Sequence, residues 1–313
     1  MSDMLEVISP GLFTTVQDLG RWGHQSSGVP VAGPMDPFAH RLANAIVSNG
    51  RERATLEITL TGPTLAFCVA RSFAVTGASF ELFVDDRLVE TESLLEARAG
   101  SVLRFGARRT GARAYLAVAG GIDVPLVLGS RATHVPSAMG GCHGRSLRKG
   151  DQLPLGAPCS TPPHARLRPL EGLAQDVAIV RVMSGPQADR FTADALDALT
   201  ASPYRVDSHS NRMGYRLVGP TLHHRHSADI ISDATPLGTV QVPASGQPLL
   251  LMADRQTTGG YAKIATVISA DIGVAGQVAP GDFLKFQACG RSEAVAALLA
   301  RERPLLALES SGI

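Results

Sequence analysis

The stretch from Gly238 to Val267 reads GTVQVPASGQPLLLMADRQTTGGYAKIATV and predicts a strand, a turn and a second strand. The apolar run 248–252 has the length and composition of a buried strand, and so does the run 264–268. The first run ends in Asp254-Arg255-Gln256, which brings three hydrogen-bonding side chains to one edge of a sheet. This stretch therefore predicts a β structure with a polar site at its edge.

Two adjacent glycines follow in the segment Thr257-Thr258-Gly259-Gly260-Tyr261, shortly before Lys263. Glycines allow a sharp turn and a close approach of the backbone to a ligand, and successive N–H groups in such a turn form an anion-binding nest. Lys263 adds a positive charge in a chain whose other lysines are Lys149 and Lys285. The alternative is a plain hairpin turn flanked by a salt bridge, but the preceding Asp-Arg-Gln favours a site.

Outside this stretch, short runs rich in Val, Leu, Ile, Phe and Thr recur between many of the 32 glycines and 20 prolines. Such spacing is typical of a β-sandwich or a β-barrel, so we expect a mainly β protein. The runs are 55–60, 65–70, 72–76, 80–84, 101–105 and 114–119.

Three segments are predicted to be helical, at residues 37–47, 192–199 and 292–301. In the first, Asp36 is placed as the N-cap and Pro37 lies in the first turn.

Residues 156–173 contain four prolines and no hydrophobic periodicity, which favours a linker over a long surface loop. We therefore predict an N-terminal β-barrel domain over residues 1–160 and a C-terminal β-barrel domain over residues 170–313. The segment LTGPTL at 60–65 resembles LVGPTL at 217–222, which agrees with two related halves.

The bulk composition excludes several classes of function. At 313 residues, with 18% charged residues and a net charge of +1, the chain gives no electrostatic case for nucleic acid or an anionic membrane. No run approaches the roughly 20 apolar residues of a membrane helix. The first ten residues lack a secretory pattern. The four cysteines form no Cys-x-x-Cys pair, so no zinc site is indicated, and we expect a cytoplasmic protein with reduced thiols.

A second polar cluster is Ser208-His209-Ser210-Asn211-Arg212-Met213-Gly214-Tyr215-Arg216, which leads into a short strand at 215–218. Asn211 offers a donor and an acceptor, and Arg212 offers a planar fork suited to a carboxylate or phosphate. A capped turn, in which Asn adopts a left-handed conformation, explains the cluster equally well.

Two other polar groups have simpler interpretations. Gln17, Asp18 and Arg21 lie in a glycine-rich segment, where an Asp–Arg pair is expected to brace the loop. His224 and His226 would share a strand face and suit zinc, but a solvated loop is favoured there.

These motifs are similar, almost from end to end, to the biotin-dependent carboxyltransferase family. The family includes allophanate hydrolase subunit 2, the carboxyltransferase region of urea carboxylase and the C-type subunit of 5-oxoprolinase. Ser48 departs from the family pattern, because relatives often have glycine at this helix end. The resemblance is carried by residues 14–21, 28–30, 56–57, 115–122, 129–131, 210–216 and 238–263.

The resemblance implies a pair of cyclophilin-like β-barrels and a protein that works beside a B-type 5-oxoprolinase partner. With a third subunit, such complexes hydrolyse 5-oxoproline to glutamate using ATP. In urea carboxylase the equivalent region passes a carboxyl group from biotin to urea. This chain has no biotinyl motif and no recognisable ATP-binding domain, so ATP is expected in the complex and biotin only on another chain.

Both reactions require a small amide to be polarised. Asn211, Lys263 and Tyr261 are the expected catalytic residues, with Tyr261 and Lys263 supplying a proton or binding an anion. The expected substrate-binding groups are Arg212, Gln256, Thr257, Thr258 and the N–H groups of Gly259 and Gly260. The alternatives are a carboxyltransferase subunit that acts on urea or a similar amide, and a regulatory protein that antagonises a kinase inhibitor.

Overall fold

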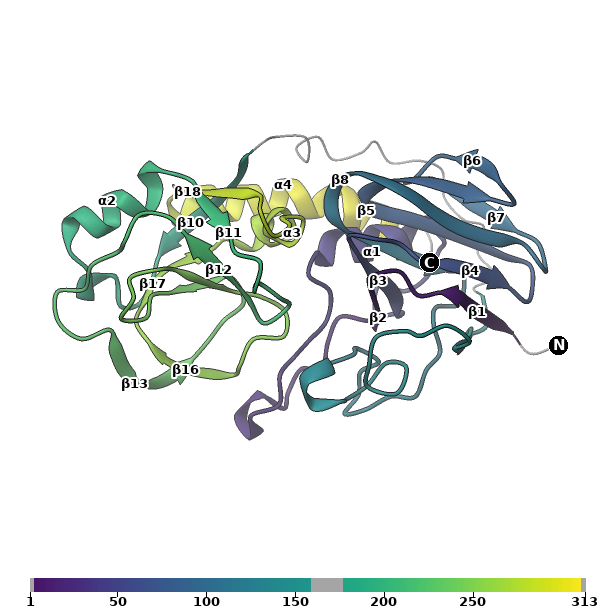
Figure 1. Ribbon diagram of the computed structural model, residues 1–313, viewed down its shortest axis with the longest axis horizontal. Coiled ribbons are helices and arrows are strands. Elements are labelled where there is room, and N and C mark those ends of the chain that lie inside the picture. Colours follow the sequence, from purple (N-terminus) through teal and green to yellow (C-terminus); the bar gives the residue numbers. More distant parts are fainter. Residues whose placement is uncertain (1–2, 159–176, 311–313) are drawn as a thin grey trace. The chain divides into compact units, whose positions relative to one another are not determined.

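The computed structural model describes residues 3–158 and 177–310, and the chain divides into two units (Figure 1). The first unit comprises Met1–Arg21, Ala32–Ala174 and Glu302–Ile313, and the second comprises Trp22–Val31 and Gln175–Arg301. The predicted domains 1–160 and 170–313 are continuous in sequence, whereas each unit also contains a short distant segment. Residues 302–313 belong to the first unit, and residues 22–31 belong to the second. The predicted linker at 156–173 lies outside the described residues from position 159 onward.

The first unit contains a nine-stranded sheet whose main path is β2-β3-β8-β4-β1-β9, with β5 also pairing with β8 and carrying β6 and β7. Among the described residues this path does not close, so the unit is a half-barrel. The strands are β1 (Met4–Ser9), β2 (Phe13–Gln17), β3 (Thr55–Thr59), β4 (Thr64–Phe67), β5 (Arg71–Val84), β6 (Arg87–Val89), β7 (Leu95–Ala97), β8 (Val102–Val118) and β9 (Gln152–Pro154).

Strands β5 and β8 are longer than the sequence pattern predicts. The runs 72–76 and 80–84 form one strand, β5, and the runs 101–105 and 114–119 fall largely within β8. The two strands pair along their whole length, with register shifts between Gly77 and Leu82. Bulges of this kind bend a strand without ending it, so each pair of separate apolar runs belongs to one long strand.

Both faces of this sheet are covered. On one face the helix α1 (Pro37–Ile46) packs against Ala74, Tyr115 and Ala117. On the other face, the alternate residues of the same strands, such as Val75 and Leu116, enter a large apolar core.

Helix α1 begins as predicted, because the carboxylate of Asp36 accepts a hydrogen bond from the N–H of Ala39 and Pro37 occupies the first turn. At its other end Ser48 has a φ of 56°. This left-handed conformation is the one that glycine adopts most readily after a helix.

The second unit is a closed barrel with the strand order β10-β17-β14-β15-β12-β11-β18. Its interior is apolar, with Tyr215, Val240, Leu250 and Ile264 no more than 1% exposed. The prediction of a mainly β protein is therefore confirmed. The barrel strands are β10 (Val177–Ser184), β11 (Tyr204–Val206), β12 (Gly214–Val218), β14 (Thr239–Gln241), β15 (Leu249–Leu251), β17 (Lys263–Val267) and β18 (Phe283–Ala288).

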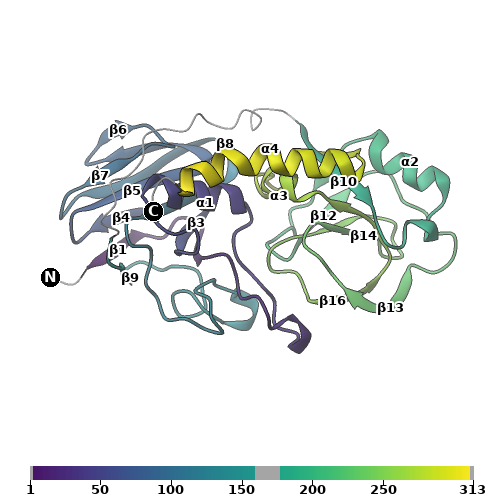
Figure 2. The ribbon, with the colours of Figure 1, turned by 180° about the vertical axis from the view of Figure 1, so that it is seen from behind.

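A two-stranded ribbon lies on the outside of this barrel. It consists of β13 (Asp229–Ala234) and β16 (Thr258–Tyr261), which pair in antiparallel fashion and pair with no barrel strand among the described residues. In both views the ribbon lies on the side of the barrel away from α2 (Ala193–Ala201) (Figures 1 and 2).

The remaining helices are short, except for the last. Thr192 caps α2 by accepting a hydrogen bond from Ala195, close to the predicted start. The final helix α4 (Arg291–Ser310) continues well past the predicted end at residue 301 and includes Pro304. Its last turns are fixed because Leu305 is fully buried against α1. The other short helices are α3 (Ile272–Gly276), η1 (Gln25–Ser27), η2 (Val135–Ser137), η3 (Ala188–Arg190) and η4 (Ser269–Asp271).

The two similar segments, LTGPTL and LVGPTL, occupy similar surroundings. A side chain at Gly62 would collide with Phe105, and one at Gly219 would collide with the ring of Tyr204. In each segment the proline carbonyl accepts a hydrogen bond from that aromatic residue. Pro63 O accepts from Phe105 N at 3.1 Å, and Pro220 O accepts from the Tyr204 hydroxyl at 3.4 Å. In both units the glycine therefore allows an aromatic residue to pack closely.

Candidate functional site

A row of side chains crosses four neighbouring strands of the barrel. Arg216 on β12 pairs with Leu249 on β15, Leu249 pairs with Gln241 on β14, and Gln241 pairs with Lys263 on β17. Directly paired residues project from the same face of a sheet, and their neighbours in sequence, such as Tyr215 and Leu250, fill the barrel interior. Arg216, Leu249 and Gln241 therefore lie on the outer face. Lys263 joins them because the β14–β17 pairing shifts register between Val240 and Gln241.

At one end of this row, Arg216 and Leu249 line a cavity of about 190 Å³. That volume is below the roughly 300–1,000 Å³ typical of pockets for drug-sized ligands, so the cavity suits a small molecule. The lining residues are His209, Asn211, Met213, Gly214, Arg216, Leu249, Leu251 and Gln256. Asn211 and Gln256, which are far apart in the sequence, thus line one cavity.

Asn211 is held in a tight turn before β12. Its Oδ1 accepts a hydrogen bond from the N–H of Met213 at 2.8 Å, and its own N–H bonds to the carbonyl of Gly214. Within the described part of the chain, the amide nitrogen Nδ2 has no acceptor. The turn therefore fixes the side chain through its oxygen and leaves the donor available to a ligand in the cavity.

Lys263 lies at the covered end of the row and does not line the cavity. Its side chain is 2% exposed, and Nζ donates to Oδ2 of Asp233 on β13 at 2.6 Å. The Lys263 ammonium, through this hydrogen bond, is the main reason that the pKa of Asp233 is lowered. The ion pair fastens the ribbon to the barrel.

The expected turn at Thr257–Tyr261 is wrong. Residues 258–261 form the extended strand β16, in which Gly259 pairs with Asp233, so successive N–H groups do not form a nest. Sequence reasoning missed the partner strand, because β13 is largely exposed and reads as a polar loop. Tyr261 is 40% exposed on this ribbon.

Gly259 has a different reason to be glycine. A Cβ atom there would lie 2.7 Å from Nε2 of Gln241 and 3.3 Å from Nε2 of Gln256. The missing side chain thus makes room for two glutamine amides, one in the cavity lining and one beneath the ribbon. Thr257 accepts a backbone bond from Thr235, and Thr258 is exposed on β16.

Arg212 is buried and paired. Its Nε and Nη2 donate to the two carboxylate oxygens of Asp254 at 3.0 and 2.9 Å, and the two side chains are 8% and 4% exposed. Such a bidentate pair joins the start of β12 to the end of β15. This geometry commits the guanidinium to Asp254.

Two residues of this face were missed by sequence reasoning. Arg216 lines the cavity, and its position in the alternating run Tyr215-Arg216-Leu217 was a signal that it faces outward. Gln241 is fully buried, with Nε2 directed to the carbonyl of Tyr261 at 3.4 Å. Its Oε1 has no hydrogen-bond partner among the described residues.

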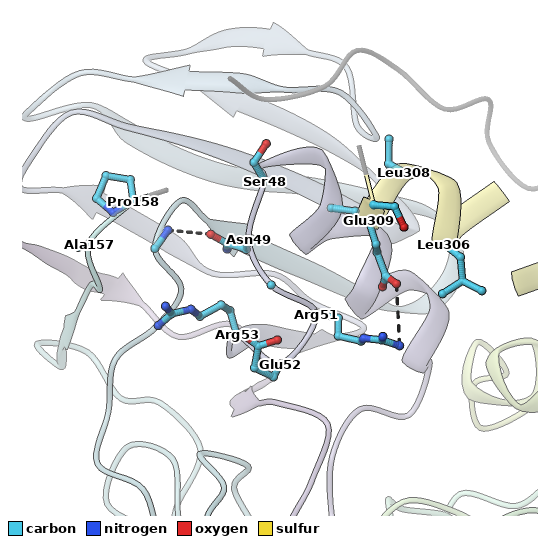
Figure 3. A pocket seen from close by; sticks show the side chains of 14 residues that line it. Ser48, Asn49, Arg51, Glu52, Arg53, Ala157, Pro158, Leu306, Leu308 and Glu309 are labelled. Atoms are coloured by element: carbon cyan, nitrogen blue, oxygen red, sulfur yellow. Dashed lines mark hydrogen bonds and ion pairs between the residues drawn. The ribbon is translucent and has the colours of Figure 1, made fainter. Parts of the chain in front are cut away.

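A larger cavity, of about 720 Å³, lies in the first unit (Figure 3). Three of its polar side chains interact with protein: Asn49 Oδ1 accepts from the N–H of Gly120, and Glu309 pairs with Arg41 and, at 4.0 Å, with Arg51. Its lining includes Pro158 and Ser310, the last described residues before two gaps. This cavity therefore supports no assignment.

The glycine-rich segment near the N-terminus is tied to the chain around residue 131. The carboxylate of Asp18 accepts hydrogen bonds from Ser130 and from the N–H of Arg131, and Arg21 donates to the carbonyl of Ala132. Gln17 donates to the carbonyl of Thr133. These buried contacts agree with the expected bracing role, with Ser130 and Arg131 as the partners shown for Asp18.

In residues 3–158 and 177–310 no three His, Cys, Asp or Glu side chains gather as metal ligands do. His224 instead bonds to the carbonyl of Val242 and packs on Phe191. Over the same residues, no helix combines the length and apolar character needed to cross a bilayer.

Known proteins resemble this chain over nearly its whole length. The family model described as "Carboxyltransferase domain, subdomain A and B" matches residues 27–288. The C-type subunit of 5-oxoprolinase from Escherichia coli (strain K12) is 41% identical over 302 residues, which cover 96% of each chain. Its counterpart from Haemophilus influenzae is 38% identical over 298 residues, covering 94% of this chain and 93% of that one.

Among solved structures, the urea amidolyase of K. lactis superposes with a TM-score of 0.91 at 32% identity. The match covers 98% of this chain and 20% of that chain.

Proposed function

This chain belongs to the family of carboxyltransferase domains with subdomains A and B, and on that premise we propose that it is the C-type subunit of an ATP-dependent 5-oxoprolinase. Two bacterial relatives that bear the name of this 5-oxoprolinase component match it along almost their whole length. The observation that carries the proposal is the small cavity that Asn211 and Gln256 both line.

The proposed reaction opens a lactam ring: water adds to the carbonyl carbon, the ring C–N bond breaks, and the nitrogen takes up a proton. Negative charge develops on the carbonyl oxygen as water adds. The amide donors of Asn211 and Gln256 are placed to stabilise that charge, a role in which one side-chain donor contributes about a hundredfold or more to the rate.

Tyr261 and Lys263 are the proposed proton donors to the leaving nitrogen. Tyr261 is 40% exposed on the ribbon and, like Lys263, is not among the residues that line the cavity. The Lys263 ammonium is bonded to Asp233, so it would act only after this ion pair opens. This arrangement makes Tyr261 the more accessible donor.

ATP supplies driving force to this reaction when the complex binds it. The residues of the second unit's cavity do not fit a nucleotide, because a volume of about 190 Å³ is too small for one. We therefore propose that ATP is bound by the complex outside this cavity. Biotin, if a carboxyl group is transferred instead, would be carried by another chain.

The name of the relatives implies further subunits, and we propose a B-type 5-oxoprolinase protein as the direct partner. The test is co-expression with the B-type and A-type subunits, followed by assays of glutamate release from 5-oxoproline and of carboxyl transfer to urea, each with and without ATP. Glutamate release that needs ATP and this chain is expected. Carboxyl transfer to urea without glutamate release from 5-oxoproline would instead support the carboxyltransferase alternative.

Variants of this chain test its part in the reaction. Asn211→Ala and Lys263→Ala are expected to reduce glutamate release sharply in the reconstituted complex. Lys285→Ala is the matched control, because Lys285 lies on β18 of the same barrel and outside the cavity. Near-normal turnover in both Asn211 and Lys263 variants would remove these residues from the mechanism.

A further inference from the structure

We propose that Arg216 binds the carboxylate of the substrate, which makes the cavity of the second unit selective for anionic amides over neutral ones. The inference rests on the proposed function, and it gives a binding role to Arg216, the last residue of the second polar cluster, to which the sequence assigned no role. It also separates two substrates of the same chemical family, because 5-oxoproline carries a carboxylate and urea does not.

The first argument is charge. Of the two arginines in this motif, Arg212 is buried and bonded bidentately to Asp254, whereas Arg216 lines the cavity. No described carboxylate pairs with the guanidinium of Arg216. The carboxylate of Asp207 lies beside the cavity lining but bonds to His209 instead, because its Oδ1 accepts hydrogen bonds from the N–H and Nδ1 of that residue. Arg216 is thus a charged group of the lining that has no ion-pair partner among the described residues.

The second argument is the chemistry of the lining. No Asp or Glu is among the eight lining residues, so nothing in the lining repels an anion. A guanidinium fork matches a carboxylate through two parallel hydrogen bonds. A carboxylate bound there would replace the water that otherwise solvates Arg216.

The third argument is the order of groups around the cavity. Arg216 stands at the beginning of the row, Leu249 and Leu251 supply apolar surface, and Asn211 and Gln256 supply amide groups. Arg216 and Asn211 are held in fixed relation, because Ser210 Oγ accepts a hydrogen bond from the N–H of Arg216 at 3.1 Å and Asn211 bridges to Gly214. A ring with a carboxylate, methylene groups and an amide matches this order.

The test compares two ligands that differ only in the carboxylate. Binding of 5-oxoproline and of 2-pyrrolidinone to the full chain is measured by saturation-transfer NMR titration for the wild type, Arg216→Met and Arg205→Met. Arg205 is the matched control, since it is an exposed arginine on the adjacent strand β11 that does not line the cavity. Circular dichroism confirms that each variant is folded.

The wild type and Arg205→Met are expected to bind 5-oxoproline about tenfold or more tightly than 2-pyrrolidinone, as a charge-assisted hydrogen bond predicts. Arg216→Met should abolish that preference, and Arg216→Lys should restore part of it. Equal affinities in the wild type, a preference that survives in Arg216→Met, or no binding of 5-oxoproline would overturn the proposal.

The assay of the reconstituted complex keeps the two proposals apart. If the complex releases glutamate but Arg216→Met raises the KM for 5-oxoproline no more than Arg205→Met does, the role of Arg216 fails and the proposed function stands. If the carboxylate preference is present and depends on Arg216 while the complex releases no glutamate, the binding role stands and the proposed function fails.

Discussion

The ammonium of Lys263 lies 2.6 Å from a carboxylate oxygen of Asp233, although the two side chains are 2% and 55% exposed. A covered cation is therefore neutralised by a carboxylate that remains in contact with water. Because Asp233 belongs to the ribbon and Lys263 to the barrel, this pair is where the ribbon is fastened at its polar end.

The asymmetry predicts unequal effects of removing the two partners. Asp233→Asn leaves a covered ammonium without its counter-charge, whereas Lys263→Met leaves an exposed carboxylate that water solvates. We expect Asp233→Asn to lower the melting temperature more than Lys263→Met, as measured by differential scanning calorimetry at pH 7. The reverse order would show that the ion pair does not fasten the ribbon.

The two adjacent glycines of β16 are predicted to differ in their tolerance of a side chain. A Cβ at Gly259 would lie 2.7 Å from Gln241 Nε2, whereas at Gly260 the nearest atom would be the carbonyl oxygen of Ile230 at 3.5 Å. Gly259→Ala is expected to cost about 1–3 kcal/mol of unfolding free energy, and Gly260→Ala less than about 0.5 kcal/mol. Urea denaturation measures both, and equal effects would contradict the packing of Gln241 against Gly259.

The Asn211→Asp variant separates the role of Asn211 in the turn before β12 from its role as a hydrogen-bond donor in the cavity. The aspartate keeps an oxygen that accepts the hydrogen bond of Met213 N–H, but it replaces the NH₂ donor with a second oxygen. Turnover of the reconstituted complex is expected to fall about a hundredfold with an unchanged melting temperature. Wild-type turnover in this variant would assign Asn211 to the turn alone.

His40 is predicted to make the first unit sensitive to acid. Its ring is fully buried and bonded to Thr55 and to the carbonyl of Arg51, and burial lowers its pKa from 6.5 to about 4. The unfolded chain therefore binds a proton between these values that the folded chain does not. The corresponding stability is complete above pH 6.5 and is lost as the pH falls to about 4, a loss on the order of 3 kcal/mol.

Urea unfolding at several pH values between 7 and 4 measures this loss. His40→Gln should flatten the dependence over that window, whatever its effect on absolute stability. His226→Gln, at an exposed position, is the control and should leave the dependence as in the wild type. An unchanged slope in His40→Gln would show that another group causes the acid sensitivity.

Local signals in the sequence predicted local structure well. Asp36 caps its helix as predicted, and Thr192, the first residue of the predicted helix 192–199, is the N-cap of α2. The apolar runs 248–252 and 264–268 contain β15 and most of β17. Such elements are specified by residues within a few positions of one another, so a single sequence contains the information.

Pairing between distant segments was not predictable in the same way. The segment at 258–261 looked like a turn because its partner, β13, lies more than twenty residues earlier and has few buried side chains. The commitment of Arg212 to Asp254 likewise depends on β12 and β15 being neighbours, which no spacing in the sequence reveals. For Arg216 the alternating run 215–217 signals an outward side chain, but only the strand order shows that Gln241 lies on the same face.

The row Arg216-Leu249-Gln241-Lys263 limits how this barrel can change in length. Removing one residue from β14 would slip the following positions by one, directing Val240 outward and a glutamine amide into the apolar interior. Insertions and deletions within these strands should therefore require a bulge, such as the one at Ile264 in β17, which lets Lys263 lie opposite Gln241. The hydrogen-bond register of the barrel strands therefore determines which side chains reach the binding face.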